Sequence, residues 1–139
     1  MGRHVLLIVT ALGEGRTGAS LLMLPTLLVH LLLGVDSAPV ETLFVGRLAG
    51  AALLAIGVIC WLSRRDDHGP GHRGLLIGVL LYDIAAAGLR AYGGLVLAMN
   101  GILLWPAVAL HVALAVWCVA CLRYNPHHPS ARAGGHHSP

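Results

Sequence analysis

The chain has 139 residues, of which 57% are hydrophobic and 11% are charged, and its formal net charge is +3. A water-soluble domain of this length could not bury so much apolar surface, so the composition indicates an integral membrane protein. The basic residues are all arginines, and they are spread along the chain without forming a compact basic face. We therefore expect no binding to nucleic acid.

Four apolar stretches predict an all-α fold, a four-helix transmembrane bundle. These stretches are Val5 to Leu33, Val40 to Leu62, Gly74 to Met99, and Ile102 to Leu122. As one helix the first would be about 43 Å long, against a hydrocarbon core of about 30 Å. Because proline disfavours helical geometry in the residue before it, we expect the first span to end near Leu24. Thr26 to Leu33 should then form a short interfacial helix that Gly34 closes.

Arginines outside the predicted spans all fall on one side of the membrane if the chain crosses it four times. These arginines are Arg3, Arg64, Arg65, Arg73, Arg123 and Arg132. The opposite side carries Asp36, Glu41 and Asn100 and no arginine. The positive-inside rule therefore places both termini and the middle loop in the cytoplasm.

Composition divides the chain into two parts. Residues 1–124 make up the predicted four-span transmembrane domain. The segment 125–139 is rich in His, Pro and Gly, which predicts a disordered cytoplasmic tail. Within the spans, small residues in Gly46-x-x-x-Gly50 and in Ala85 to Gly88 predict close contact between helix backbones.

Ionisable residues inside the spans are the strongest functional signal, since each charge at the centre of a span opposes insertion by about 3 kcal/mol. Glu14 and Asp83 should both lie about 14 Å from the cytoplasmic boundary, with His111 near the same level. Arg47 and Arg90 should lie in the outer half. We expect these side chains to face inward as a polar cavity, in which two arginines cap two carboxylates and a histidine.

Two interpretations of these charges are open. Such a cavity, with one excess positive charge, could hold the polar or anionic head group of a lipid or a quinone-like molecule. The same residues could instead be internal ion pairs that fix the helix register. Arg16 fits neither interpretation, because it points about 200° away from Glu14 on a regular helix. It requires its own partner, a break in the helix, or a subunit interface.

The sequence predicts no catalytic residue, cofactor or metal site. No nucleophile and base are recognisable as a pair, so we expect a non-enzymatic protein. His30 and His111 differ in predicted depth, which argues against axial haem ligation. Cys118 and Cys121 form a CxxC, but with Cys60 they are expected to be reduced, apolar packing residues near the cytoplasmic boundary.

A set of short motifs resembles a known family. The motifs are Glu14 to Gly18, Pro25, Leu32-Leu33-Gly34, Gly46-Arg47-Leu48-Ala49-Gly50, Leu81-Tyr82-Asp83, and Trp105-Pro106-Ala107-Val108 with His111. Over Thr10 to about Ala115, the chain resembles uncharacterised small four-span bacterial membrane proteins of DoxX-like layout. The resemblance implies a location in the bacterial cytoplasmic (inner) membrane. It also implies asparagine at position 83, where this chain has aspartate.

The favoured function is that of a non-enzymatic accessory subunit or binding module of a larger membrane complex. Its predicted binding residues are Glu14, Arg47, Asp83, Arg90 and His111. The alternative is a proton-coupled small transporter in which Glu14 or Asp83 exchanges its proton for substrate. The expected partners are the lipid bilayer and either other membrane subunits or further copies of this chain.

Overall fold

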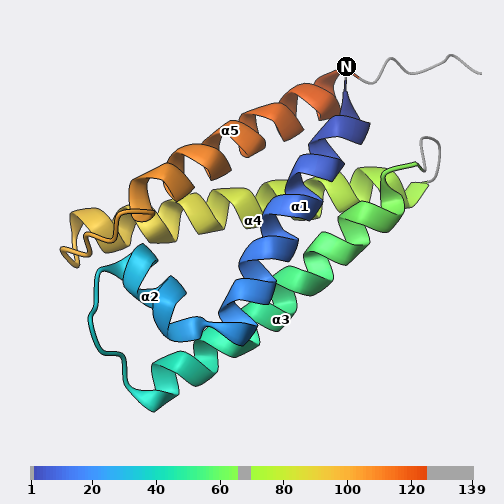
Figure 1. Cartoon of the computed structure of the whole chain (residues 1–139). Coiled ribbons are helices and arrows are strands. Elements are labelled where there is room, and N and C mark those ends of the chain that lie inside the picture. Colours follow the sequence, from blue (N-terminus) through green and yellow to red (C-terminus); the bar gives the residue numbers. More distant parts are fainter. Residues whose placement is uncertain (1, 66–69, 125–139) are drawn as a thin grey trace, which may run out of the picture.

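The computed structural model describes residues 2–65 and 70–124, and within these ranges the chain is helical with short connections. The helices are α1 (Arg3–Met23), α2 (Pro25–Leu33), α3 (Val40–Ser63), α4 (Pro70–Leu95) and α5 (Leu104–Arg123) (Figure 1). The tail predicted for residues 125–139 lies outside the described residues.

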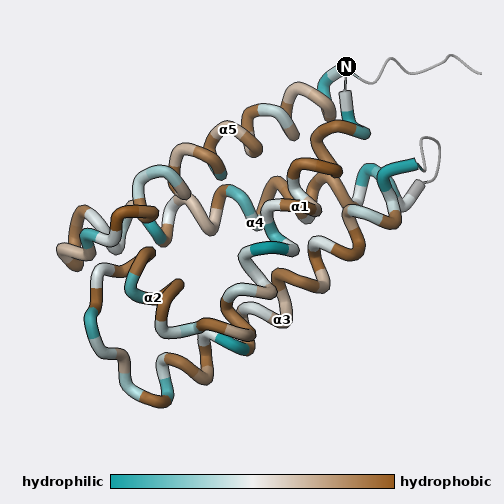
Figure 2. The backbone as a smooth tube through the Cα atoms, viewed as in Figure 1, coloured by the Kyte–Doolittle hydropathy of each residue, from teal (hydrophilic) through white to brown (hydrophobic). Residues whose placement is uncertain are grey.

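Four of these helices, α1, α3, α4 and α5, are long and apolar enough to cross a membrane. Figure 2 shows hydrophobic residues along all of them, with isolated hydrophilic positions inside the helices. The short α2 directly follows the first long helix. The structure therefore confirms the prediction of an all-α protein with four candidate membrane spans and a short helix after the first.

The break between α1 and α2 lies where the proline predicts it. Leu24 leaves helical geometry with a φ of −132° and a ψ of 55°, and Pro25 is the first residue of α2. At its other end, α2 is closed by Gly34, which has the left-handed φ of 74° that favours glycine. The backbone N–H of Leu103 then donates to the carbonyl of Leu31 at 2.9 Å, which attaches α2 to the start of α5.

The end of α4 differs from the prediction. Hydropathy places the end of this span at Met99, whereas the helix ends at Leu95. The N–H of Val96 still donates to the carbonyl of Tyr92 at 2.8 Å, but Ala98 has a positive φ of 54° and the chain reverses there. Hydropathy does not reveal this turn because its residues are as apolar as the helix before it.

α1 and α3 form an antiparallel pair whose backbones are in close contact. A Cβ added to Gly18 would lie 2.6 Å from the carbonyl oxygen of Gly50, and one added to Gly57 would lie 2.9 Å from the amide nitrogen of Gly15. Gly46 is in looser contact, since its added Cβ would lie 3.8 Å from the side chain of Leu21. The structure confirms the packing role predicted for Gly50.

The packing prediction for Ala85 to Gly88 holds only in part. Ala86 and Ala87 are buried. Ala85 and Gly88 are exposed, and a Cβ added to Gly88 would meet nothing within 4 Å. The prediction is wrong for these two residues, because the side of α4 on which they lie has no neighbour among the described residues.

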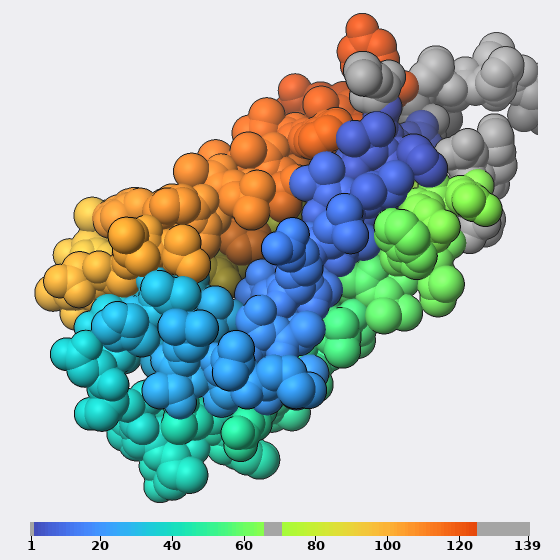
Figure 3. Space-filling view, viewed as in Figure 1, coloured from blue at the N-terminus to red at the C-terminus, as the bar shows by residue number. Residues whose placement is uncertain are grey.

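α4 and α5 form a second pair, joined by the short connection after Leu95. We call the end of the molecule with the starts of α1 and α4 the terminal end, and the opposite end the α2 end. In Figure 3, α1 lies between α5 and α3, and α2 covers part of the α2 end.

An apolar core joins the two helix pairs at the terminal end. All four long helices contribute to it, and we call it the apolar layer. Its buried members are Leu6, Leu7, Ala11, Cys60, Leu76, Val79, Leu114, Cys118 and Cys121. The cysteines are free and buried, which confirms their prediction as packing residues.

Candidate functional site

Polar side chains from both helix pairs meet next to the apolar layer. They are Glu14 of α1, Tyr82 and Asp83 of α4, and His111 of α5, and we call them the polar layer. Glu14 and His111 are each 5% exposed, and Asp83 is 0% exposed. At the helical rise they lie between about 16 and 20 Å from the terminal end, near the middle of a hydrocarbon core of about 30 Å.

Helical periodicity explains why these polar side chains point inward. Each occupies a position in the buried stripe of its own helix, where the neighbouring members of the stripe are apolar or small. The buried neighbours of the polar residues include Ala11 and Gly18 on α1, Val79 and Ala86 on α4, and Leu114 and Cys118 on α5. The contacts that bury these stripes therefore also bury the polar layer.

Two hydrogen bonds connect the polar layer across helices. The Tyr82 hydroxyl donates to Glu14 Oε2 at 2.8 Å, linking α4 to α1. Asp83 Oδ1 lies 2.9 Å from His111 Nδ1, which donates when the aspartate is ionised and Nδ1 carries the proton. The rings of Tyr82 and His111 meet edge to face, with their centroids 5.5 Å apart. The ring contact thus connects the two hydrogen bonds.

Asp83 has an unsatisfied polar atom. Its Oδ2 is buried and has no hydrogen-bond partner in the described part of the chain, although Oδ1 is bonded to His111. Leaving a buried acceptor unpaired costs about 1–3 kcal/mol, and more when the group is charged. A proton or a cation at this oxygen would lower that cost.

The same atoms match the donor set of a metal site. Ligand atoms from Glu14, Asp83 and His111 all lie within 4.8 Å of one another, and two carboxylates with an imidazole suit Zn²⁺. Zinc ligands lie about 2.0–2.2 Å from the ion, so these atoms would have to move closer together to bind it. A proton requires no such movement.

Arg90 lies beside the polar layer on α4. It is half-buried, and its guanidinium donates to the carbonyl of Ala86 at 3.2 Å. Its positive charge acts on Glu14, which is also within electrostatic range of His111, Asp83 and the Cys60 thiol. Arg90 therefore balances part of the negative charge from a distance.

Arg47 does not belong to the polar layer, and the prediction that it caps the carboxylates is wrong. α3 packs mainly on α1, where Gly57 lies beside Gly15 and thus near the level of Glu14. Arg47 lies about 15 Å from Gly57 along α3. Its side chain is exposed and lines a groove at the α2 end. The position of a residue along its span predicts its depth in the membrane, but it does not predict which neighbouring helix the side chain faces.

Arg16 is exposed near the middle of α1, while Glu14 on the same helix is buried. α1 continues through this region as a regular helix, so a break at the nearby glycines is excluded. Among the described residues, Arg16 has no hydrogen-bond or ion-pair partner. The subunit interface that the sequence also offers for Arg16 stays a prediction.

Tyr82 was not among the predicted binding residues. The available signal was its position, because a tyrosine in the middle of a span lies away from the membrane boundary where this residue usually anchors. A buried tyrosine hydroxyl normally has a hydrogen-bond partner, and Glu14 provides it here. Tyr82 also lines a recess between α3 and α4 with a volume of about 240 Å³.

Comparisons with protein-family models, curated proteins and solved structures found no match to this chain. The resemblance to small bacterial proteins of DoxX-like layout therefore stays a prediction.

Proposed function

We propose that this chain is a small proton-coupled membrane transporter in which the polar layer binds and releases a proton. The observation that carries the proposal is the burial of two carboxylates between the helix pairs, each hydrogen-bonded to a side chain of another helix. Glu14 is bonded to Tyr82, and Asp83 is bonded to His111. The proposal favours the transporter over a head-group binding module, because Glu14, Asp83 and His111 are buried and a proton can reach such a site more readily than a head group.

Electrostatics supports proton binding in the polar layer. A single charged side chain at this depth costs about 3 kcal/mol, and two carboxylates with oxygens within 4.8 Å also repel each other. Uptake of one proton leaves one negative charge. Tyr82 and His111 stabilise that charge by hydrogen bonds, and Arg90 stabilises it by its positive charge.

Helix packing supports a movement that this proton could control. α1 packs mainly on α3, and α4 packs mainly on α5, so the long helices form two bodies. In many transporters the ion site lies at the midplane between two bodies that rock against each other. The hydrogen bond from Tyr82 to Glu14 is one of the links between the bodies here. A change in the protonation of Glu14 would alter this link directly.

The recess beside Tyr82 offers a place for a transported molecule. Apart from the tyrosine, its lining is apolar or small. The lining residues are Ile56, Ile59, Leu75, Gly78, Val79 and Tyr82. We therefore expect a small, mainly apolar substrate that meets the polar layer through the Tyr82 hydroxyl.

Infrared difference spectroscopy of the full chain in liposomes at two pH values tests proton binding. We expect a carboxylic acid C=O band that weakens as the pH rises and changes in Glu14→Gln and Asp83→Asn. Glu41→Gln is the matched control, because Glu41 is an exposed carboxylate in the first turn of α3. A wild-type spectrum without any titrating carboxyl band from Glu14 or Asp83 would contradict the proposal.

Proteoliposomes under an imposed proton gradient test transport, with a panel of small, mainly apolar compounds as probes. Glu14→Gln should abolish proton-driven uptake while the protein still inserts in normal amounts. Loss of assembly in this variant, with no flux in the wild type, would instead support a scaffold.

Arg16 favours a second candidate function, that of an accessory subunit in a larger membrane complex. Exposing its charge to lipid near the middle of a span costs about 3 kcal/mol, which an acidic group on another subunit would offset. We expect blue-native electrophoresis of membranes to show a larger assembly that Arg16→Gln dissociates. An unchanged assembly would eliminate this role for Arg16.

We also propose that the terminal end faces the cytoplasm of a bacterial cell whose inner membrane holds the protein. The arginines at the described helix ends and connections gather at this end. They are Arg3, Arg64, Arg65, Arg73 and Arg123. The positive-inside rule supports this orientation. A cysteine introduced at Ser37 should react with an impermeant maleimide added outside the cell.

A further inference from the structure

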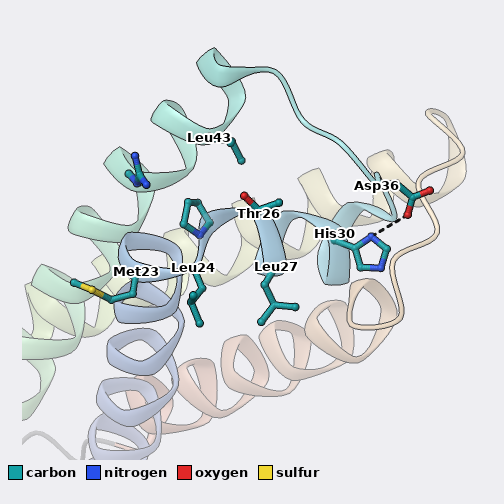
Figure 4. Close-up of a pocket in the computed structure, with 9 residues that line it drawn as sticks. Met23, Leu24, Thr26, Leu27, His30, Asp36 and Leu43 are labelled. Atoms are coloured by element: carbon teal, nitrogen blue, oxygen red, sulfur yellow. Dashed lines mark ion pairs between the residues drawn. The ribbon is translucent and has the colours of Figure 1, made fainter.

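A groove at the α2 end combines apolar walls with an unpaired cation. It lies where the end of α1, the start of α2 and the first turns of α3 come together, and its volume is about 500 Å³ (Figure 4). Met23, Leu24, Leu27 and Leu43 contribute apolar surface to it. Arg47 also lines it, is exposed, and has no hydrogen-bond or ion-pair partner among the residues that the structure describes.

Arg47 lies in the half of its span nearer the α2 end, from which a long side chain can reach the lipid head groups. Its Cα is about 10 Å from the start of α3 at Val40, and a long arginine side chain can extend its guanidinium toward the membrane boundary. Gly50, one turn further along α3, lies against Leu21 and Leu22 near the end of α1. Arg47 is thus close to the level at which the chain turns from α1 into α2, across the end of the bundle.

The other polar groups of the groove favour an anion over a cation. The acidic side chain, Asp36, has its Oδ1 3.4 Å from Nδ1 of His30, as the dashed line in Figure 4 shows, and a protonated His30 neutralises it. The N-cap residue Leu24 makes no side-chain cap hydrogen bond, and the backbone N–H groups of Thr26 and Leu27 have no backbone acceptor within residues 2–65 and 70–124. Their partial positive charge adds to that of Arg47.

We propose that this groove binds one anionic phospholipid, with its phosphate on the Arg47 guanidinium and an acyl chain along the apolar walls. Guanidinium and phosphate form charge-assisted, often bidentate hydrogen bonds. The bound phosphate neutralises a cation that would otherwise face lipid, and the acyl chain covers the exposed Leu27 and the partly buried Leu43. This site is separate from the polar layer, and the proposal does not depend on proton coupling.

Native mass spectrometry of the full chain in mild detergent, titrated with phosphatidylglycerol, tests the proposal. We expect one lipid to bind to the wild type, and Arg47→Gln to weaken binding by about tenfold or more, as expected for loss of a charge-assisted hydrogen bond. Arg47→Lys should restore part of the affinity. Arg16→Gln is the matched control, since Arg16 is also exposed within a span but does not line the groove.

Leu43→Trp is a second test of the proposal that leaves Arg47 in place. The larger ring should fill the groove and weaken binding without changing the charge. Equal weakening by Arg47→Gln and Arg16→Gln would overturn the proposal, because it would indicate non-specific attraction to exposed arginines. Binding that survives both Arg47→Gln and Leu43→Trp would overturn it as well.

Two further titrations identify the source of the bound phosphate. Phosphatidylcholine should bind more weakly than phosphatidylglycerol, and millimolar inorganic phosphate should not displace the lipid. Displacement by inorganic phosphate would overturn the lipid assignment in favour of a free-anion site. Glu14→Gln should leave lipid binding unchanged, so a failure of this proposal is distinguishable from a failure of proton coupling.

Discussion

The apolar layer and the polar layer both join the two helix pairs, but they do so by different physics. In the apolar layer, side chains such as Leu6, Leu7 and Cys60 are 0% exposed and interact only through packing. In the polar layer, the hydrogen bond from Tyr82 to Glu14 joins the two pairs, and the one between Asp83 and His111 joins α4 to α5 within one pair. A change of protonation can therefore alter the second layer and leaves the first unchanged.

This difference indicates where the molecule can move. Packing between helices in lipid has no hydrophobic driving force beyond what the lipid itself provides, so close fit and hydrogen bonds decide the contact. The apolar layer is suited to hold the two helix pairs together at the terminal end, because its packing does not depend on protonation. The polar layer is suited to act as an adjustable contact, because the hydrogen bond from Tyr82 to Glu14 changes when a proton binds.

The largest effect on stability should come from the apolar layer. Leu7→Ala removes a fully buried side chain, and we expect it to lower the free energy of unfolding by about 3 kcal/mol through the cavity it leaves. Reversible unfolding in mixed micelles, followed by circular dichroism, measures the loss. The infrared carboxyl band should not change. Leu48→Ala is the control, because Leu48 is 64% exposed on α3 and its truncation should have little effect.

An intermediate effect should come from Asp83→Ala, which leaves His111 Nδ1 without its partner. We expect a loss of about 2 kcal/mol in the same unfolding assay, together with a change in the carboxyl band. Asp83→Asn retains an acceptor for His111 and should cost less. If Asp83→Ala proved as mild as Leu48→Ala, the hydrogen bond between Asp83 and His111 would not stabilise the contact of α4 with α5, and the polar layer would depend on Tyr82 and Glu14 alone.

The smallest effect should come from Tyr82→Phe, which removes only the hydroxyl that donates to Glu14. We expect a loss of about 1 kcal/mol, the usual net contribution of one hydrogen bond. A double-mutant cycle with Glu14→Ala, which removes the acceptor, sharpens the test, since two residues in contact should show a coupling energy. Strictly additive losses in this cycle would mean that the two side chains do not interact across the helix pairs.

Much of the candidate site could be predicted from depth and periodicity. The levels of Glu14, Asp83 and His111 follow from counting residues along each span, and the structure brings these three side chains together. Tyr82 was missed because the search for site residues followed charge and depth, and a tyrosine carries no charge. The prediction for Arg47 was wrong because residue counting gives only the depth of a side chain. The direction in which that side chain points depends on which neighbouring helix packs against its own helix.

By itself, the sequence determined the class of protein, the four candidate spans, and the break before Pro25, because these depend on local hydropathy and on the backbone geometry of proline and glycine. Tertiary structure decided that α1 pairs with α3 and α4 with α5, and that Arg47 lines a groove at the α2 end while Glu14 joins Tyr82. These outcomes depend on contacts between residues far apart in the chain, such as the approach of Gly18 to Gly50. Such contacts cannot be predicted from the residue pattern of a single helix.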